Sequence, residues 1–182
     1  TMEKELNVIF GKNNINFFYE NFSFDINTLN EYERSLSHLL KSISFFKDDV
    51  LKLSAFSINV NIVVCNDAYI QQLNSEHRQK PTITDVLSFP LQENIRVGEF
   101  DRFVPELELG DLYICHSVCE KQAQEFSLTF HEEFLHLCVH GFLHLCGFDH
   151  EENEVEEKIM EEYEKEIVSN ISMSKKGDSP YK

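Results

Sequence analysis

Three histidines stand close together in the segment HGFLHLCGFDH, which covers residues 140–150. His140 and His144 are four residues apart, and on a helix such positions lie nearly above one another, about 6 Å apart along the axis. Gly147 stands where a helix would end, because glycine readily adopts the left-handed backbone conformation. The chain can then turn back and bring His150 toward the same point. Three converging imidazoles would hold a metal ion and leave a fourth position for water, as in catalytic zinc sites.

The spacing of these residues equals that of the long zinc-protease motif H-E-x-x-H-x-x-G-x-x-H. The proteases carry a glutamate general base directly after the first histidine, whereas this chain has Gly141 there. A pair of histidines four residues apart also occurs by chance on helix surfaces. Here, however, the segment is apolar, and an unpaired imidazole in a core is costly. We therefore predict a metal-dependent hydrolase and keep a zinc metallopeptidase as an alternative.

Other residues near this motif have alternative interpretations. His136 lies four residues before the first ligand, so it is either a fourth ligand or, as we favour, a residue that packs beside the site. Cys138 and Cys146 fall on the far side of the helix and are interpreted as small buried side chains. Asp149, followed by Glu152, resembles a helix cap. Its alternative role is to orient a ligand imidazole.

The charge of the chain limits its partners. Sixteen Lys and Arg stand against thirty-two Asp and Glu, which gives a net charge of −16 over 182 residues. Such a charge repels nucleic acid and anionic membrane surfaces. Residues 151–166 alone contain nine Glu and two Lys. An anionic substrate would therefore need a local cationic patch, a metal ion, or a partner that delivers it.

The cysteines and the absence of a long apolar run indicate a reducing, cytoplasmic compartment. The number of cysteines is odd and no Cys-x-x-Cys occurs, so a disulfide framework is not expected. The first residues lack the pattern of a secretory signal. No apolar stretch approaches the roughly 20 residues that cross a bilayer. We expect no membrane partner. Cysteines stand at positions 65, 115, 119, 138 and 146. Cys115 and Cys119 could pair across a turn, although we favour core packing.

The periodicity of apolar residues predicts an α+β fold in a single domain over residues 1–171. Strands are expected at 5–10, 55–65, 85–90 and 109–115. Helices are expected at 28–46, 66–73, 116–126, 129–146 and 151–168. These elements would form a small mixed β-sheet of about four strands flanked by helices. The metal site would lie on the long helix 129–146 and the turn that follows it, and residues 172–182 would be a disordered tail.

Three blocks of the sequence resemble the YbeY family of bacterial metal-dependent endoribonucleases, which have a zincin-like fold. The blocks are LNSEHR (73–78) with TDVLSFP (84–90), LGD (109–111), and HGFLHLCGFDH (140–150). The last block follows the family pattern H-G-x-L-H-L-x-G-Y-D-H except at Phe148, where the family usually has tyrosine. His77 replaces a customary aromatic residue before Arg78.

The resemblance implies a single-strand-specific endoribonuclease that acts in 3′-end maturation of the small-subunit (16S) ribosomal RNA and in ribosome quality control. It implies one Zn²⁺ per chain, held by His140, His144 and His150. Arg78 corresponds to the functionally important arginine of the family, and a guanidinium can grip a phosphodiester and stabilise its developing charge. Without the resemblance, a lone arginine would be interpreted as a surface charge. Lys80, Ser88 and Asp85 are further candidates for the cleft, although Asp85 could simply hydrogen-bond a turn.

The partners implied are single-stranded RNA and the small ribosomal subunit. Because cations are few, we expect a ribosomal protein or an assembly GTPase to deliver the RNA. A third function remains open, namely a non-catalytic ribosome assembly factor whose metal is structural. Its acidic C-terminal helix would be a docking face, although a solvated helix face explains that composition more simply. Three imidazoles also suit nickel, copper or iron.

Overall fold

The computed structural model describes residues 4–149 and 153–177, and in these residues five strands form one mixed sheet. The order of the strands is β1-β2-β3-β5-β4. The central strands β2, β3 and β5 are parallel, and β1 and β4 pair antiparallel at the two edges. Their bounds are β1 Leu6–Phe10, β2 Asn13–Tyr19, β3 Ser57–Cys65, β4 Val86–Pro90 and β5 Glu106–Cys115. The α+β class is confirmed.

The described part of the chain has one strand more than the four that the sequence predicts, and the additional strand is β2. Its sequence, NNINFFY, is rich in asparagine, a residue that is depleted in strands. In the sheet, Ile15 and Phe17 are fully buried, while Asn14 and Asn16 lie on the other face. A turn signal precedes the strand, because Gly11 has a φ of 60° at the first position of a two-residue hairpin loop.

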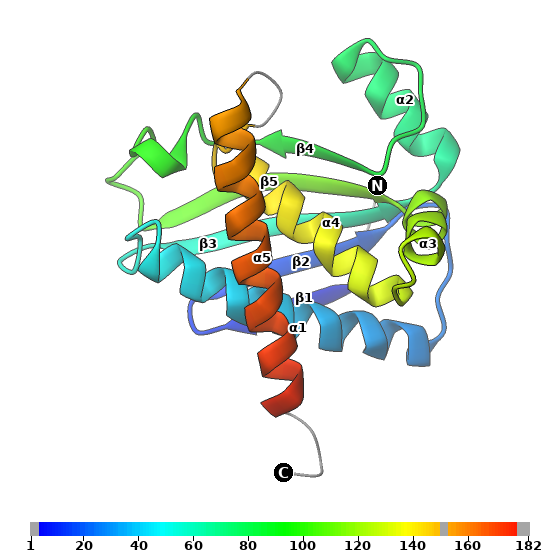
Figure 1. Cartoon of the computed structure of the whole chain (residues 1–182), viewed down its shortest axis with the longest axis horizontal. Coiled ribbons are helices and arrows are strands. Elements are labelled where there is room, and N and C mark those ends of the chain that lie inside the picture. Colours follow the sequence, from blue (N-terminus) through cyan, green and yellow to red (C-terminus); the bar gives the residue numbers. More distant parts are fainter. Residues whose placement is uncertain (1–3, 150–152, 178–182) are drawn as a thin grey trace.

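The helices are distributed unequally over the sheet. Helix α1 (Ile26–Asp49) and α4 (Phe130–Leu145) lie against one face, and α5 (Glu154–Gly177) crosses in front of both (Figure 1). The shorter helices α2 (Asp67–Arg78), α3 (His116–Glu125) and the turn η1 (Ile95–Val97) lie toward the ends of the strands. Each of the five predicted helices is present. Among the described residues, none of the helices combines the length and the apolar character needed to span a membrane.

Two helices are longer than the sequence predicts. Helix α2 continues past Leu73 to Arg78, where Gln79 ends it in the left-handed conformation with a φ of 58°. Helix α5 continues through Gly177, so the predicted start of a tail at residue 172 is too early. Ile171 is buried at the end of the apolar stripe, and adding residues to an existing helix costs little. Residues 178–182 lie outside the described part of the chain.

An aromatic cluster fixes α5 against the rest of the core. The ring of Tyr163 lies 5.1 Å from Phe46 of α1 and 5.4 Å from Phe148, which follows α4. Phe46 in turn contacts Phe142 at 6.1 Å. Such edge-on aromatic contacts are favourable beyond the area they bury. The cluster determines which residues of α5 face α4. The five cysteines are free and buried, so Cys115 and Cys119 do not pair, and the predicted burial of Cys138 and Cys146 is confirmed.

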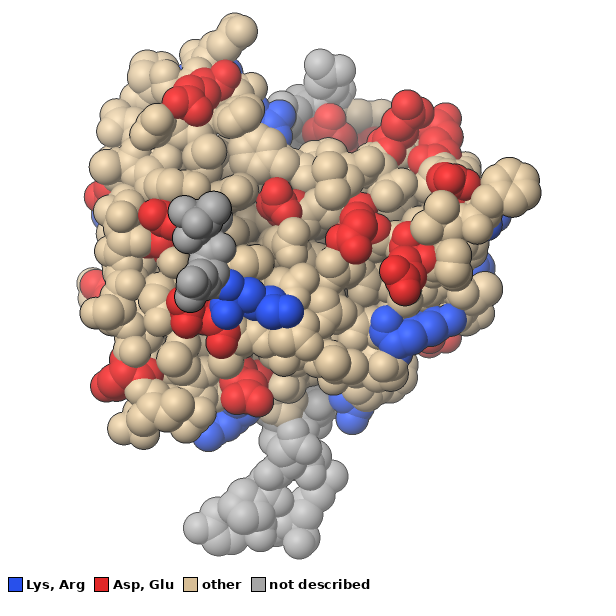
Figure 2. Space-filling model, turned by 180° about the vertical axis from the view of Figure 1, so that it is seen from behind, with Lys and Arg blue, Asp and Glu red and all other residues tan. Residues whose placement is uncertain are grey.

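The opposite face of the sheet is covered less and is polar. Asparagines of β1, β2 and β3 hydrogen-bond across the strands and continue to carboxylates of β5, with Asn61 Nδ2 donating to Asp111 Oδ1 at 2.9 Å. Seen from behind, Asp and Glu outnumber Lys and Arg on the surface (Figure 2). The polar side chains of this face therefore hydrogen-bond to one another.

Candidate functional site

Helix α4 carries the predicted histidine pair, and its two ends are set by local sequence. At the start, Thr129 Oγ1 accepts from Glu132 N–H at 3.1 Å, and Glu132 Oε1 accepts from Thr129 N–H at 3.2 Å, which forms a capping box. At the end, Gly147 N–H donates to His144 O and Phe148 N–H donates to Leu143 O, both at 3.0 Å. With a φ of 99° at Gly147, this pair of bonds is the glycine-terminated helix end that the sequence predicts.

Gly141 lets the middle of α4 approach the sheet closely. A Cβ atom at this position would lie 2.8 Å from Leu112 Cδ2 and 3.3 Å from Ser88 Oγ. Ser88 Oγ also reaches Gly141 O at 3.5 Å. A larger residue would push α4 away from β4 and β5. The glycine therefore sets how far the two histidines stand from the strand opposite.

The two imidazoles of α4 face each other through their Nε2 atoms. These atoms of His140 and His144 lie 3.1 Å apart, and the ring planes make an angle of 79°. Two nitrogens bound to one tetrahedral zinc at about 2.1 Å are separated by about 3.4 Å, so the spacing fits two ligands of a single ion. His150, the third predicted ligand, lies outside the described residues. Among the residues described, no set of three or more such side chains is placed to hold a metal.

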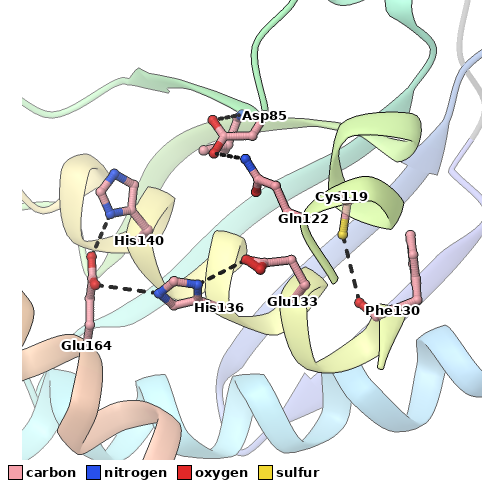
Figure 3. A network of polar contacts seen from close by, with 9 residues as sticks. Asp85, Cys119, Gln122, Phe130, Glu133, His136, His140 and Glu164 are labelled. Atoms are coloured by element: carbon pink, nitrogen blue, oxygen red, sulfur yellow. Dashed lines mark hydrogen bonds and ion pairs between the residues drawn. The ribbon is translucent and has the colours of Figure 1, made fainter. Parts of the chain in front are cut away.

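A carboxylate of α5 determines which nitrogen of His140 is available. Glu164 Oε1 accepts from His140 Nδ1–H at 2.5 Å (Figure 3). Burial alone would raise the pKa of Glu164, but hydrogen bonds with His136 and His140 lower it to about 2. An ionised carboxylate is an acceptor only, so the proton of a neutral His140 lies on Nδ1 and the lone pair on Nε2. The lone pair therefore points toward His144.

His136 lies between two carboxylates. Its Nδ1 lies 3.0 Å from Glu133 Oε1, and its Nε2 lies 3.8 Å from Glu164 Oε2 (Figure 3). The contact with Glu164 and then that with Glu133 raise the pKa of His136 to about 9, against the effect of burial. Both ring nitrogens thus face carboxylates rather than the Nε2 pair. This placement agrees with a residue that packs beside the site and not with a fourth ligand.

A cleft of about 820 Å³ runs between α4 and the edge strand β4. It brings together predicted residues from both walls: Arg78, Lys80, Asp85, Ser88, His140 and His144. The guanidinium of Arg78 donates from Nη2 to Ser88 O at 2.7 Å, at the free edge of the sheet. Arg78 is exposed, so it can reach a ligand in the cleft.

The carboxylate of Asp85 hydrogen-bonds to the backbone at the start of β4. Asp85 Oδ1 accepts from Val86 N–H at 2.7 Å and Asp85 Oδ2 accepts from Gln122 Nε2 at 3.4 Å, so this carboxylate stabilises the local turn and links it to α3 (Figure 3).

The prediction that Asp149 caps the last helix is wrong. Helix α5 begins at Glu154, and Asn153 Oδ1 accepts the N–H of Val155 at 2.9 Å.

Glu164 was not predicted from the sequence, although a signal for it exists. It belongs to a segment so rich in glutamate that each one looks like a surface charge. Yet Met160, Ile167 and Ile171 are buried, and Glu164 stands on the same helical stripe. A single carboxylate on the buried side of an amphipathic helix suggests a specific partner.

The fold and the cleft define an α+β protein with a helical histidine pair on one wall and an arginine on the other. A family model described as Endoribonuclease YbeY matches residues 19–172. A protein of Thermotoga maritima named Endoribonuclease YbeY is 33% identical over 135 residues, which cover 74% of this chain and 82% of the relative. One of Oenococcus oeni with the same name is 33% identical over 156 residues, or 83% and 99% of the two chains.

A solution structure of a Thermotoga maritima protein agrees in fold as well. It matches with a TM-score of 0.54 and 27% identity, and the match covers 92% of this chain and 95% of the other. The family model and the matches to these relatives each cover most of this chain. The chain belongs to the YbeY family.

Proposed function

We propose that this chain is a metal-dependent endoribonuclease that cleaves single-stranded RNA. The observation that carries the proposal is the convergence of His140 and His144, whose Nε2 atoms lie 3.1 Å apart in a cleft that Arg78 also lines. The names of the family and of its relatives support a nuclease. Zn²⁺ is the proposed metal, with His140, His144 and His150 as its ligands.

The residues of the cleft divide the work between its two walls. A bound zinc would supply a water of lowered pKa and polarise a phosphoryl oxygen. His140 and His144 would hold it, and Glu164 keeps the Nδ1 proton of His140 in place. Arg78 would bind the phosphodiester and stabilise negative charge that develops on it.

A metallopeptidase is a weaker alternative on steric grounds. The proteases with this histidine spacing need a glutamate where the chain has Gly141. Position 141 is buried against Leu112 and Ser88, where even a Cβ atom would be too close. A glutamate there would point into the sheet rather than the cleft. The geometry of α4 is thus adapted to a mechanism without that base.

A non-catalytic assembly factor with a structural metal is the third candidate. The observation in its favour is the acidic exposed side of α5, which could dock a basic protein. However, Glu164 of this helix faces inward and holds a site histidine. Helix α5 therefore has a role at the cleft whether or not its outer side binds a partner.

The biological setting that we propose is 3′-end maturation of the small-subunit (16S) ribosomal RNA and ribosome quality control in the cytoplasm. The net charge of −16 argues against tight binding to free RNA. Delivery by a ribosomal protein or an assembly GTPase on the small ribosomal subunit would overcome this repulsion. Binding of short RNA by the isolated protein should accordingly be weak, and tight binding that does not respond to salt would contradict delivery by a partner.

The decisive assay presents three substrates to the metal-loaded protein: a short single-stranded RNA, the same RNA in a duplex, and an unstructured protein. We expect cleavage of the single strand only. Exhaustive chelation should remove that activity, and His144→Ala should lose both metal and activity. Elemental analysis of the purified protein identifies the metal.

Each alternative has its own outcome in this assay. Cleavage of the unstructured protein would favour the peptidase. No cleavage of any substrate, together with unfolding on chelation, would favour the assembly factor. Cleavage that persists after chelation would exclude the metal from the mechanism. The variant His77→Ala, which removes an exposed imidazole outside the predicted ligand set, controls for metal content.

A further inference from the structure

Next to the cleft, the last turn of α2 brings a cation and aromatic rings to the free edge of the sheet. Arg78 holds this turn against β4 through its 2.7 Å hydrogen bond to Ser88 O. The guanidinium carbon of Arg78 lies 5.5 Å from the ring centroid of Phe89, and the exposed ring of His77 lies 5.1 Å from the same centroid at 70°. Beside the cleft, this edge of the sheet is therefore aromatic as well as cationic.

These rings lie on the opposite side of β4 from the histidine pair. Successive residues of a strand point to opposite faces, and Ser88 reaches α4 while Phe89 points toward α2. Phe89 then contacts Tyr113 at 5.6 Å, and Tyr113 stacks with Tyr69 at 6.1 Å and 28°. A row of rings thus starts beside Arg78 and leads away from the cleft around the edge of the sheet.

The distribution of charge along the cleft limits where a phosphate can bind. Of the described residues that line it, Arg78 and Lys80 are the cations, and Asp85 and Asp149 are the acids. A phosphate would be attracted to the end formed by Arg78 and Lys80. In a chain with a net charge of −16, further affinity for RNA must come from contacts that do not depend on phosphate. Stacking of a base on an aromatic ring is such a contact.

We propose that the exposed ring of His77, held edge-on against Phe89, is a stacking site for one base of single-stranded RNA, adjoining the phosphate contact of Arg78. The inference rests on the proposed function and names a contact beside the cleft that would select the substrate. Bases in a duplex are already stacked on their neighbours, whereas a base of a single strand can be splayed onto a protein ring. The site would therefore favour single strands.

Phe89 also contributes to the small apolar cluster under α2, so its removal could disturb the fold. His77 is exposed, and it is the residue to change. The variants are His77→Ala, which removes the ring, and His77→Phe, which restores one. Ser75→Ala, an exposed change on the same helix, is the matched control.

The first measurement is cleavage of a short single-stranded RNA by the metal-loaded full-length protein. We expect His77→Ala to raise KM about tenfold, the effect of losing one stacked base, with kcat at saturating RNA unchanged. His77→Phe should restore the KM of the unchanged protein, and Ser75→Ala should leave it as it is. The preference for single-stranded over duplex RNA should fall in His77→Ala.

The second measurement uses the metal-stripped protein and RNAs that carry the fluorescent base 2-aminopurine at one position each. One position should be quenched on binding, and quenching there should be lost in His77→Ala. An abasic nucleotide at that position should weaken binding to the unchanged protein about tenfold and to His77→Ala hardly at all.

The outcomes separate this inference from the proposed function. If RNA is cleaved but His77→Ala has an unchanged KM, or the abasic RNA loses the same affinity for both proteins, the stacking site is refuted and the nuclease stands. If the unchanged protein cleaves no RNA, the proposed function fails. The fluorescence measurement then still decides whether a base stacks on His77.

Discussion

The two walls of the cleft are built in different ways. On the α4 and α5 wall, His140 is tied to Glu164, and Tyr163 next to that glutamate is locked into the aromatic core. On the β4 and α2 wall, Arg78 is exposed, donates one hydrogen bond to the backbone carbonyl of Ser88 and lies over the ring of Phe89. The α4 and α5 wall is therefore part of the packed core, whereas the β4 and α2 wall is part of the exposed surface.

This difference suits the different tasks that we propose for the two walls. A metal site requires ligands that are fixed before the ion arrives, because a misplaced imidazole lowers its affinity. A site for a flexible single strand can instead adjust on binding. Changes on the packed wall should therefore alter metal binding and stability, while changes on the exposed wall should alter catalysis with the fold intact.

The sharpest test of the exposed wall is Arg78→Ala. We expect cleavage of single-stranded RNA to fall about 100-fold, because a charged donor to the reacting phosphate is lost. Metal content should not change, and the melting temperature should fall by no more than about 4 °C, since Arg78 is exposed and its hydrogen bond is worth about 1 kcal/mol. Elemental analysis, a melting curve and initial rates measure the three quantities.

The control for this variant is Arg102→Ala, which removes an exposed guanidinium that lies 4.9 Å from the ring of Phe100, outside the cleft. Its cleavage rate should be unchanged. If Arg78→Ala keeps full activity, Arg78 is not part of the site. If it loses metal, the two walls are coupled and the contrast between them is wrong.

On the packed wall, Glu164→Gln should weaken metal binding about 10- to 100-fold, the usual effect of losing a carboxylate behind a ligand histidine. The amide keeps the size of the side chain but not the charge that fixes the proton of His140 on Nδ1. Competition with a chelator of known affinity measures the change. Glu162→Gln, an exposed position of the same helix, should bind metal as the unchanged protein does. Equal affinities for the two variants would show that Glu164 does not support the metal.

Gly141→Ala tests how tightly the packed wall is fitted. The new Cβ would lie 2.8 Å from Leu112 Cδ2, in a buried position. Overpacking costs about 1–3 kcal/mol, whereas alanine gains about 1 kcal/mol of helix propensity over glycine. We expect a net loss of about 1 kcal/mol in the free energy of unfolding, measured in urea. Ser75→Ala should stay within about 0.5 kcal/mol. A more stable Gly141→Ala would mean that α4 can move from the sheet.

What could be predicted from the sequence follows the same division. The bounds of α4 and the bend at Gly147 depend on residues within a few positions of each other, and both were predicted closely. Strand β2 was missed because its asparagines are stabilised by partners on other strands. Glu164 was missed because its partner His140 lies 24 residues away, on another helix. The placement of Arg78 at the cleft came from the family resemblance and not from its neighbours in the chain.

The smallest expected effect is on the pH dependence of stability, and it comes from His136, a half-exposed residue of the packed wall. Its pKa is raised from 6.5 to about 9 by Glu164 and Glu133, so the folded state binds the extra proton between these values. The stabilisation is complete below pH 6.5 and is lost as the pH rises through about 9. Because the side chain is 47% exposed, the effect should stay below about 1 kcal/mol.

The measurement compares the free energy of unfolding of the metal-stripped protein with that of His136→Gln from pH 6 to pH 10. Glutamine still offers a donor to Glu133, whose carboxyl is only 1% exposed. Glu132, Glu161 and Lys165 line the same hollow and are present in both proteins, so their titration cancels in the difference. The difference should shrink above pH 8. A constant difference across this range would mean that His136 stabilises the fold by packing alone. The charge of Glu164 would then act on His140 and not through His136.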